Sequence, residues 1–272
     1  MIAVEPLAGA SAGPLAINLL TTAAVTMGVM IATFCYARAK DRYRTVDVVW
    51  GVAFAVVAVV GLGLSAGHGD PGRRFLVTAL TVVWGLRLAL HIGLRARGAP
   101  EDPRYAAMLA RAPGRRSWYA FTKIYLLQGA LVWFVSLPVQ VAQYEKGALG
   151  PIAAAGCALW LFGFCFEAIG DWQLVRFKAD PANRGTLLQT GLRRYTRSPN
   201  YFGDACVWWG LFAIAADQPV GLLTVLSPVV MNWLLAYGSG RPLMERHLAA
   251  TRPDYARYAA HTSRFLPRRP TR

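Results

Sequence analysis

Five ionisable residues lie inside or at the edge of otherwise apolar runs of this 272-residue sequence, namely Asp47, Arg87, His91, Glu167 and Asp171. Charged side chains are costly in a hydrocarbon environment, so such positions are candidates for function. Arg87 and His91 are four residues apart, as are Glu167 and Asp171, so each pair would project from one helix face. A structural role is the alternative, either in pairing with a neighbouring helix or, for Asp47, as a negative charge favoured at the start of its helix.

A second group of chemically useful residues forms the segment 170–204, which reads GDWQLVRFKADPANRGTLLQTGLRRYTRSPNYFGD. Guanidinium groups bind phosphate through paired hydrogen bonds, so the arginines here could hold a phosphate-bearing cofactor. Asn200 offers a donor and an acceptor for a carboxamide, Pro199 restricts the backbone before it, and Gly203 permits close approach. No G-x-G-x-x-G motif follows a predicted strand, so a Rossmann site is not expected.

The composition points away from a soluble protein. The chain is 55% hydrophobic and only 16% charged, yet 29 Lys and Arg against 14 Asp and Glu give a net charge of +15. A nucleic-acid-binding domain of this basicity would be less apolar, so we expect no nucleic-acid partner. The four cysteines lie in apolar runs without the spacing of metal ligands, so we also expect no metal site.

The apolar runs predict an all-α, polytopic membrane protein in which residues 1–272 form a single integral membrane domain. Each run is about as long as the helix needed to cross a bilayer, and none alternates with a period of two. About seven transmembrane helices are expected, near 15–37, 46–66, 75–94, 119–141, 150–171, 203–218 and 220–238.

The positive charges predict the orientation of these spans. The regions after the first, third, fifth and seventh spans carry 24 of the Lys and Arg residues, whereas the alternate loops carry only Arg73, Arg74 and Lys146. By the positive-inside rule the N-terminus lies outside and the C-terminus in the cytoplasm. We expect an integral, multi-pass protein of a bacterial inner membrane whose basic face also meets anionic membrane lipids.

The segment 197–204, RSPNYFGD, together with Asp171, Gly191-Leu192 and the tail Tyr255…Tyr258…Thr262-Ser-Arg-Phe-Leu-Pro267, resembles the steroid 5α-reductase superfamily. The resemblance is closest to its bacterial branch of unknown function, DUF1295, and covers roughly residues 40–270. A reductase-like C-terminal region would occupy residues 150–270. Ser198 departs from the His that is more usual at its position.

The resemblance implies an enzyme that holds NADPH in a cytoplasm-facing cavity. Hydride would pass to a conjugated carbon–carbon double bond of a lipid, such as a 3-oxo-4-ene steroid. Matching positions imply contacts with the nicotinamide or ribose for Asp171, Asn200, Tyr201 and Asp204. Candidates for the phosphates are Arg176, Lys178, Arg197 and Arg241.

The catalytic residues follow the family less closely. The steroid enzymes carry a Gln-Glu pair on their second span, which is absent here, and a Tyr on their third. Asp47 lies in the second span instead, and His91 lies near the place of the Tyr. We expect Asp47 and His91 to face the substrate, with His91 or Tyr125 donating the proton, and the substrate could be another unsaturated lipid.

Two other functions fit parts of the sequence. Membrane methyltransferases that use S-adenosylmethionine share an R-x-P-x-Y-x-G core and a following Glu, here Arg197 to Gly203 and Glu245. A non-enzymatic transporter or lipid-binding scaffold is the second alternative, but the sequence shows none of the internal symmetry that is typical of transporters. The oligomeric state cannot be inferred from the sequence.

Overall fold

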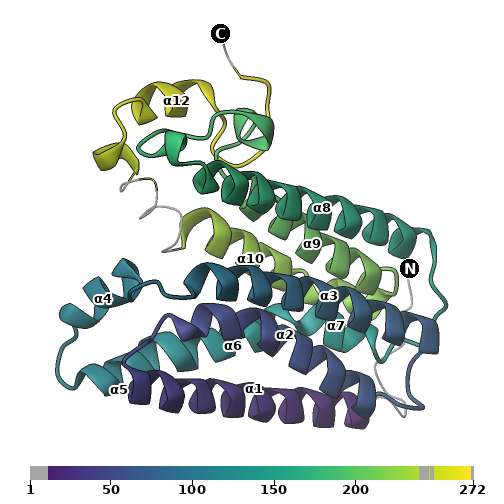
Figure 1. The fold of residues 1–272 in the computed structure, drawn as a ribbon. Coiled ribbons are helices and arrows are strands. Elements are labelled where there is room, and N and C mark those ends of the chain that lie inside the picture. Colours follow the sequence, from purple (N-terminus) through teal and green to yellow (C-terminus); the bar gives the residue numbers. More distant parts are fainter. Residues whose placement is uncertain (1–11, 239–244, 246–247, 271–272) are drawn as a thin grey trace. The chain divides into compact units, whose positions relative to one another are not determined.

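The computed structural model describes residues 12–238, 245 and 248–270, and in these residues it is helical without a strand (Figure 1). The helices of its first part are α1 (Ala12–Lys40), α2 (Thr45–Leu64), α3 (Pro71–Ala96), α4 (Pro103–Ala110), α5 (Arg116–Ala120), the π-helical turn η1 (Phe121–Leu126), α6 (Leu127–Val135) and α7 (Leu137–Ala142). There follow α8 (Pro151–Ala179), η2 (Pro181–Asn183), η3 (Gly191–Arg194), α9 (Pro199–Ala215), η4 (Pro219–Thr224), α10 (Leu226–Tyr237) and α12 (Tyr255–His261).

Among the described residues, five helices are long and apolar enough to cross a membrane, which is consistent with a multi-pass membrane protein. They are α1, α2, α3, α8 and the stretch Pro219–Tyr237 that joins η4 to α10. The two other apolar segments expected to span are also helical but differ in form. Residues 119–141 are divided among short helices, and α9 has only 17 residues.

The division of the fourth apolar segment has a local cause. Pro138 follows the break between α6 and α7 at Ser136, and a proline ring removes one helical hydrogen bond and clashes with the preceding turn. The Phe134 carbonyl, which lies four residues before Pro138, accepts instead from the Ser227 hydroxyl at 2.9 Å, and the Ser136 hydroxyl donates to the Trp133 carbonyl at 2.8 Å.

The third apolar helix begins earlier than hydropathy predicts. The Asp70 side chain accepts a hydrogen bond from the Arg73 backbone at 2.8 Å, and Pro71 occupies the first turn, so α3 starts four residues before the predicted position. Arg73 and Arg74, which the sequence places in a loop, therefore lie in α3 and are buried.

The described chain groups into two compact units. Unit 1 comprises Met1–Ala153 with Ile214–Ser227, and unit 2 comprises Ala154–Ala213 with Pro228–Arg272. The single membrane domain expected over residues 1–272 stays a prediction.

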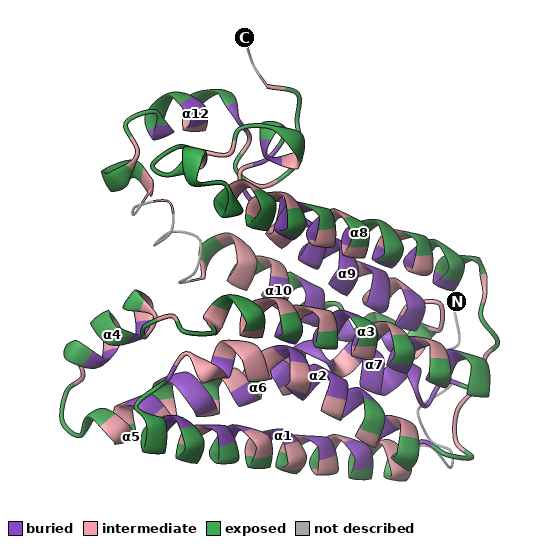
Figure 2. Ribbon diagram, viewed as in Figure 1, coloured by how far each residue is buried: buried purple, intermediate pink, exposed green. Residues whose placement is uncertain are grey.

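Unit 1 is held together in part by polar side chains on the buried face of α1. Asn18 and Thr22 donate to the Gln140 side chain at 3.3 and 2.6 Å, and all three residues are buried. The opposite face of α1 is largely exposed (Figure 2). Lipid provides no hydrophobic force that drives helices together, so such interhelical hydrogen bonds help fix their pairing.

Helices α2 and α3 of unit 1 lie side by side and approach closely at two glycines (Figure 1). A Cβ atom on Gly51 would lie 2.3 Å from the Gly85 carbonyl oxygen, and one on Gly85 would lie 2.4 Å from that of Gly51. Small residues of this kind allow membrane helices to pack backbone against backbone.

Unit 2 repeats this arrangement between α8 and α9. A Cβ atom on Gly203 would lie 2.6 Å from both the Gly163 carbonyl oxygen and the Glu167 backbone nitrogen, and Gly210 is equally tight against Gly156 and Trp160. Gly203 therefore permits a close approach, as the sequence indicates. The group that approaches it is the backbone of α8 in the same unit.

A third polar cluster surrounds Arg73 in unit 1. Its guanidinium lies 2.7 Å from Asp217 and 3.4 Å from Glu145, and it donates to the carbonyl oxygens of Gly147, Ala148 and Ile214. Burial raises the pKa of Glu145 to about 8, although the charge of Arg73 opposes this shift. Burial also acts to raise the pKa of Asp217, but hydrogen bonds from Arg73 and from the Gly150 and Ala153 backbones, together with the charge of Arg73, outweigh it and lower that pKa. One cation thus faces two carboxylates, and Glu145 is the one that retains a proton near neutral pH.

We predict that Gly51→Ala lowers the midpoint of thermal unfolding in detergent, because the added methyl group forces α2 and α3 apart at a cost of about 1–3 kcal/mol. Gly63→Ala on the same helix is the matched control, since no atom lies within 4 Å of the position that its added methyl group would take. Equal midpoints for the two variants would contradict the proposed packing.

We predict that the stability of the protein falls as the pH rises from about 5 to about 8. In this range the folded state holds a proton on Glu145 that the unfolded chain, with a pKa near 4.5, has already lost. Glu145→Gln should flatten this slope in pH-dependent unfolding experiments. Asp41→Asn, which alters an exposed carboxylate, should leave it unchanged; an unchanged slope in Glu145→Gln would refute the assignment.

Candidate functional site

A basic cavity of about 550 Å³ lies within unit 2. It is bounded by the end of α8, the segment 183–198 and the C-terminal part of the chain. Five of its described lining residues are cations and one is a carboxylate, and tyrosine hydroxyls contribute to the remaining surface. These polar lining residues include Lys178, Arg184, Arg193, Arg197, Arg252, Glu245, Tyr255 and Tyr258.

The cavity depends on docking of the tail against the turn that precedes α9. The Arg197 backbone donates to the Ser263 carbonyl at 2.9 Å, and the Thr196 hydroxyl donates to the Phe265 carbonyl at 2.8 Å. The Arg268 backbone donates to the Tyr195 carbonyl at 2.9 Å. These bonds bring together the two motifs on which the family resemblance rests.

Arg193 is the most enclosed cation of the cavity, with a relative exposure of 9%. Its guanidinium donates to the Arg197 carbonyl at 3.0 Å, and its own carbonyl accepts from the Tyr258 hydroxyl at 2.7 Å. Burial lowers the pKa of Arg193, whereas the neighbouring Tyr258, Asp171 and Tyr201 act to raise it. An arginine remains charged even so, which places a fixed positive charge deep in the cavity.

Arg197 is held by side chains from the C-terminal part of the chain. It donates to the Tyr255 hydroxyl at 3.2 Å and lies 3.5 Å from Glu245, which also pairs with Arg264 at 3.2 Å. Burial raises the pKa of Tyr255 and raises the pKa of Tyr258 to about 12. Both phenols are therefore neutral hydrogen-bonding groups near pH 7.

The structure divides the predicted cofactor residues into several groups. Lys178 and Arg197 line the basic cavity, and Asp171 and Tyr201 lie close enough to Arg193 to influence its pKa. Asn200 and Asp204 belong to the first turns of α9, where Asp204 is buried. Arg176 lines a second cavity, and Arg241 lies outside the described residues.

Sequence reasoning names none of Arg184, Arg193 and Arg252 as an individual candidate, because it treats the first two only as members of the basic segment 170–204 and Arg252 only as part of the basic tail. It also gives no role to Tyr255 and Tyr258, although both belong to the tail motif. The sequence signal that could identify these residues is their position within or beside the two family motifs. Only the docked tail shows that they surround one cavity.

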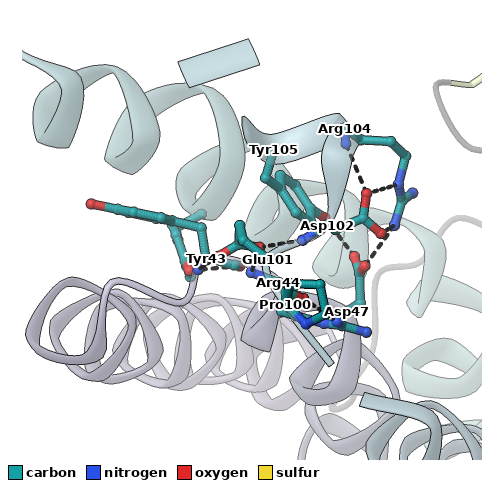
Figure 3. A network of polar contacts seen from close by, with 9 residues as sticks. Tyr43, Arg44, Asp47, Pro100, Glu101, Asp102, Arg104 and Tyr105 are labelled. Atoms are coloured by element: carbon teal, nitrogen blue, oxygen red, sulfur yellow. Dashed lines mark hydrogen bonds and ion pairs between the residues drawn. The ribbon is translucent and has the colours of Figure 1, made fainter. Parts of the chain in front are cut away.

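Of the predicted catalytic residues, Asp47 lies in a polar network in unit 1 (Figure 3). Its carboxylate accepts from the Tyr105 hydroxyl at 2.5 Å and forms an ion pair with Arg104 at 2.7 Å. Arg104 also pairs with Asp102 at 3.0 Å. Burial, and then the charge of Asp47, raise the pKa of Tyr105, so that this phenol stays a hydrogen-bond donor.

Glu101 connects this network to the start of α2. Its carboxylate accepts from the backbone nitrogens of Tyr43 at 2.5 Å and Arg44 at 3.0 Å (Figure 3). The buried Tyr125 hydroxyl donates to the Tyr43 carbonyl at 3.0 Å, which places Tyr125 beside the same loop as Asp47. His91 is partly exposed on α3, two residues before Gly93, which packs near Val48 of α2.

We predict that Arg104→Gln destabilises the protein by about 1–2 kcal/mol, because it removes a partly buried ion pair and leaves Asp47 with a single described partner. Arg116→Gln is the control, since its pair with Asp41 is 3.6 Å long and exposed. Loss of this exposed ion pair should lower the free energy of unfolding by less than about 1 kcal/mol. Thermal unfolding of the purified variants tests this difference, and equal losses would show that the Arg104 network is not a special support for α2.

Comparison with known proteins identifies the family. The model of a protein of unknown function, DUF1295, matches residues 33–262. The chain is also 24% identical over 255 residues to an uncharacterized protein of Schizosaccharomyces pombe, in a match that covers 82% of this chain and 72% of that one. No solved structure matches the chain. Because the family match extends over most of the sequence, the protein belongs to the DUF1295 family of the steroid 5α-reductase-like superfamily.

Proposed function

We propose that the protein is an NADPH-dependent membrane oxidoreductase that reduces a carbon–carbon double bond of a lipid, such as a steroid 3-oxo-4-ene or a similar enone. The observation that carries the proposal is the basic cavity, in which five described cations and one carboxylate surround about 550 Å³. This volume is within the range of small-molecule and cofactor sites, and the excess positive charge suits several phosphate groups.

The residues of the cavity fit the cofactor. Lys178, Arg197 and the deeper Arg193 would hold phosphate oxygens, while Arg184 and Arg252 line the same cavity and would hold the remaining phosphate. The Tyr255 hydroxyl accepts from Arg197 and would donate its own proton to a ribose or phosphate oxygen, whereas the Tyr258 hydroxyl donates to the Arg193 carbonyl and supports that arginine. When bound, NADPH supplies the hydride for the reduction.

The polar residues next to Arg193 extend the proposed site toward the nicotinamide and ribose. Asp171 and Tyr201 lie near Arg193, and Asn200 carries the amide group that can pair with a carboxamide. Asp204 follows one turn later on α9, and its burial makes it a positioning group for this part of the site.

Reduction of an enone requires a proton donor and stabilisation of the developing enolate. Asp47, His91 and Tyr125 remain the proposed substrate-facing residues. Either His91 or Tyr125 would donate the proton, and Asp47, which is held by Tyr105 and Arg104, would have a positioning role.

The topology proposed with this function has seven crossings of a bacterial inner membrane, with the N-terminus outside. The charge distribution supports it, because the basic loops and tail then lie together in the cytoplasm, where NADPH is available. Membrane lipids and the lipid substrate are the proposed partners.

The principal alternative is a methyltransferase that uses S-adenosylmethionine. Glu245 does line the cavity, but it pairs with Arg197 and Arg264, and the surplus of cations opposes a positively charged sulfonium. The two functions are separated by titrating the purified protein with each cofactor and following thermal unfolding. Stabilisation by NADPH supports the reductase, whereas stabilisation by S-adenosylmethionine alone would overturn it.

We predict that Arg252→Gln weakens NADPH binding roughly tenfold, equivalent to about 1.4 kcal/mol, because one phosphate contact is lost. Arg257→Gln is the control, since this arginine lies on α12 in an exposed pair with Asp254 and does not line the cavity. Calorimetric titration measures both affinities. Equal affinities for the two variants would place the phosphates elsewhere.

A further inference from the structure

A second cavity of about 440 Å³ opens beside the last turns of α8 in unit 2. Its described ionisable lining residues are one cation, Arg176, and one carboxylate, Asp180. Trp172 supplies an aromatic wall, and polar groups are contributed by Gln173, Asn183 and Thr190. The balance of charge therefore differs from that of the basic cavity.

The length of α8 places this cavity at the surface of the hydrocarbon core. The helix has 29 residues and would be about 44 Å long, whereas the hydrocarbon core is about 30 Å thick. Counted from Pro151, about 20 residues reach position 170, so Trp172 and Arg176 follow at the depth of the lipid headgroups. Tryptophan is enriched at this depth in membrane proteins.

An exposed stripe on α8 leads to the cavity. Phe162, Cys165, Ile169, Trp172 and Arg176 follow one another at intervals of three or four residues, and all are exposed. Residues at this spacing share one helix face. The stripe is apolar until its last member, as expected of a surface that contacts an acyl chain below and a headgroup above.

The two opposite charges of the cavity remain available to a ligand. The Arg176 guanidinium lies over the Trp172 ring, 5.5 Å from its centroid. One oxygen of Asp180 accepts from the Ala182 backbone at 2.9 Å. Among the ion pairs of the described residues, none joins Arg176 to Asp180.

We propose that this cavity binds the headgroup of a phospholipid that carries both a phosphate and a primary ammonium, as phosphatidylethanolamine does. Arg176 binds the phosphate, and Asp180 accepts hydrogen bonds from the ammonium, with the acyl chains lying along the apolar stripe. A quaternary ammonium lacks these N–H donors, and a glycerol headgroup lacks the positive charge, so both bind less well.

The experiment compares the thermal unfolding of the full-length protein in detergent micelles that contain equal mole fractions of phosphatidylethanolamine, phosphatidylcholine or phosphatidylglycerol. The wild-type protein should show the largest upward shift with phosphatidylethanolamine. Arg176→Gln should lose most of that shift. Asp180→Asn keeps the hydrogen bond acceptor for Ala182 and should remove the preference for phosphatidylethanolamine over phosphatidylglycerol.

Arg95→Gln is the matched control, because Arg95 is an exposed arginine in the last turn of another apolar helix, α3. It should retain the full lipid response. An equal response of wild type to all three lipids, or an unchanged response in Arg176→Gln, would overturn the proposal. NADPH binding should be unaltered in Arg176→Gln, and its loss there without a change in the lipid response would assign Arg176 to the cofactor instead.

Discussion

The hydrogen bonds between the turn before α9 and the C-terminal tail hold five cations around one cavity. Like charges at this density repel one another, so a structure that gathers them needs other contacts to keep them together. Backbone and hydroxyl groups at residues 195–197 provide those contacts by pairing with Ser263, Phe265 and Arg268. Because these contacts are between neutral groups, they neutralise none of the cations of the cavity.

Within each of the two units the helices are paired by a different means. In hydrocarbon, apolar side chains gain nothing by leaving lipid for one another, so close backbone packing and interhelical hydrogen bonds become important. The glycine contacts between α2 and α3 and between α8 and α9 provide the first, and the Asn18, Thr22 and Gln140 contacts provide the second. In unit 2 the same packing fixes Gly203, which separates the motif residues Asn200 and Tyr201 from Asp204.

Hydropathy is sufficient to locate all seven apolar segments, each of which is helical, because the length of a membrane helix is set by the bilayer. It does not predict the short helices within 119–141, where Pro138 and Ser136 change the local hydrogen bonding. Nor does it predict the burial of Arg73, because the partners Glu145 and Asp217 are distant in sequence. For the same reason the pairing of Asp47 with Arg104 and Tyr105 cannot be derived from Asp47 and its neighbours. The tail motif is recognisable in the sequence, but its role in forming a cavity requires the fold.

The central claim is that the basic cavity serves hydride transfer to a lipid, and isotopic labelling tests it most directly. The purified protein would be incubated with lipids extracted from its own membrane and with NADPH that carries deuterium at the transferred position of the nicotinamide. We expect a lipid product that has gained one deuterium and one hydrogen across a double bond, as measured by mass spectrometry. A lipid that acquires no deuterium, but does acquire a labelled methyl group from S-adenosylmethionine in the parallel reaction, would contradict the claim.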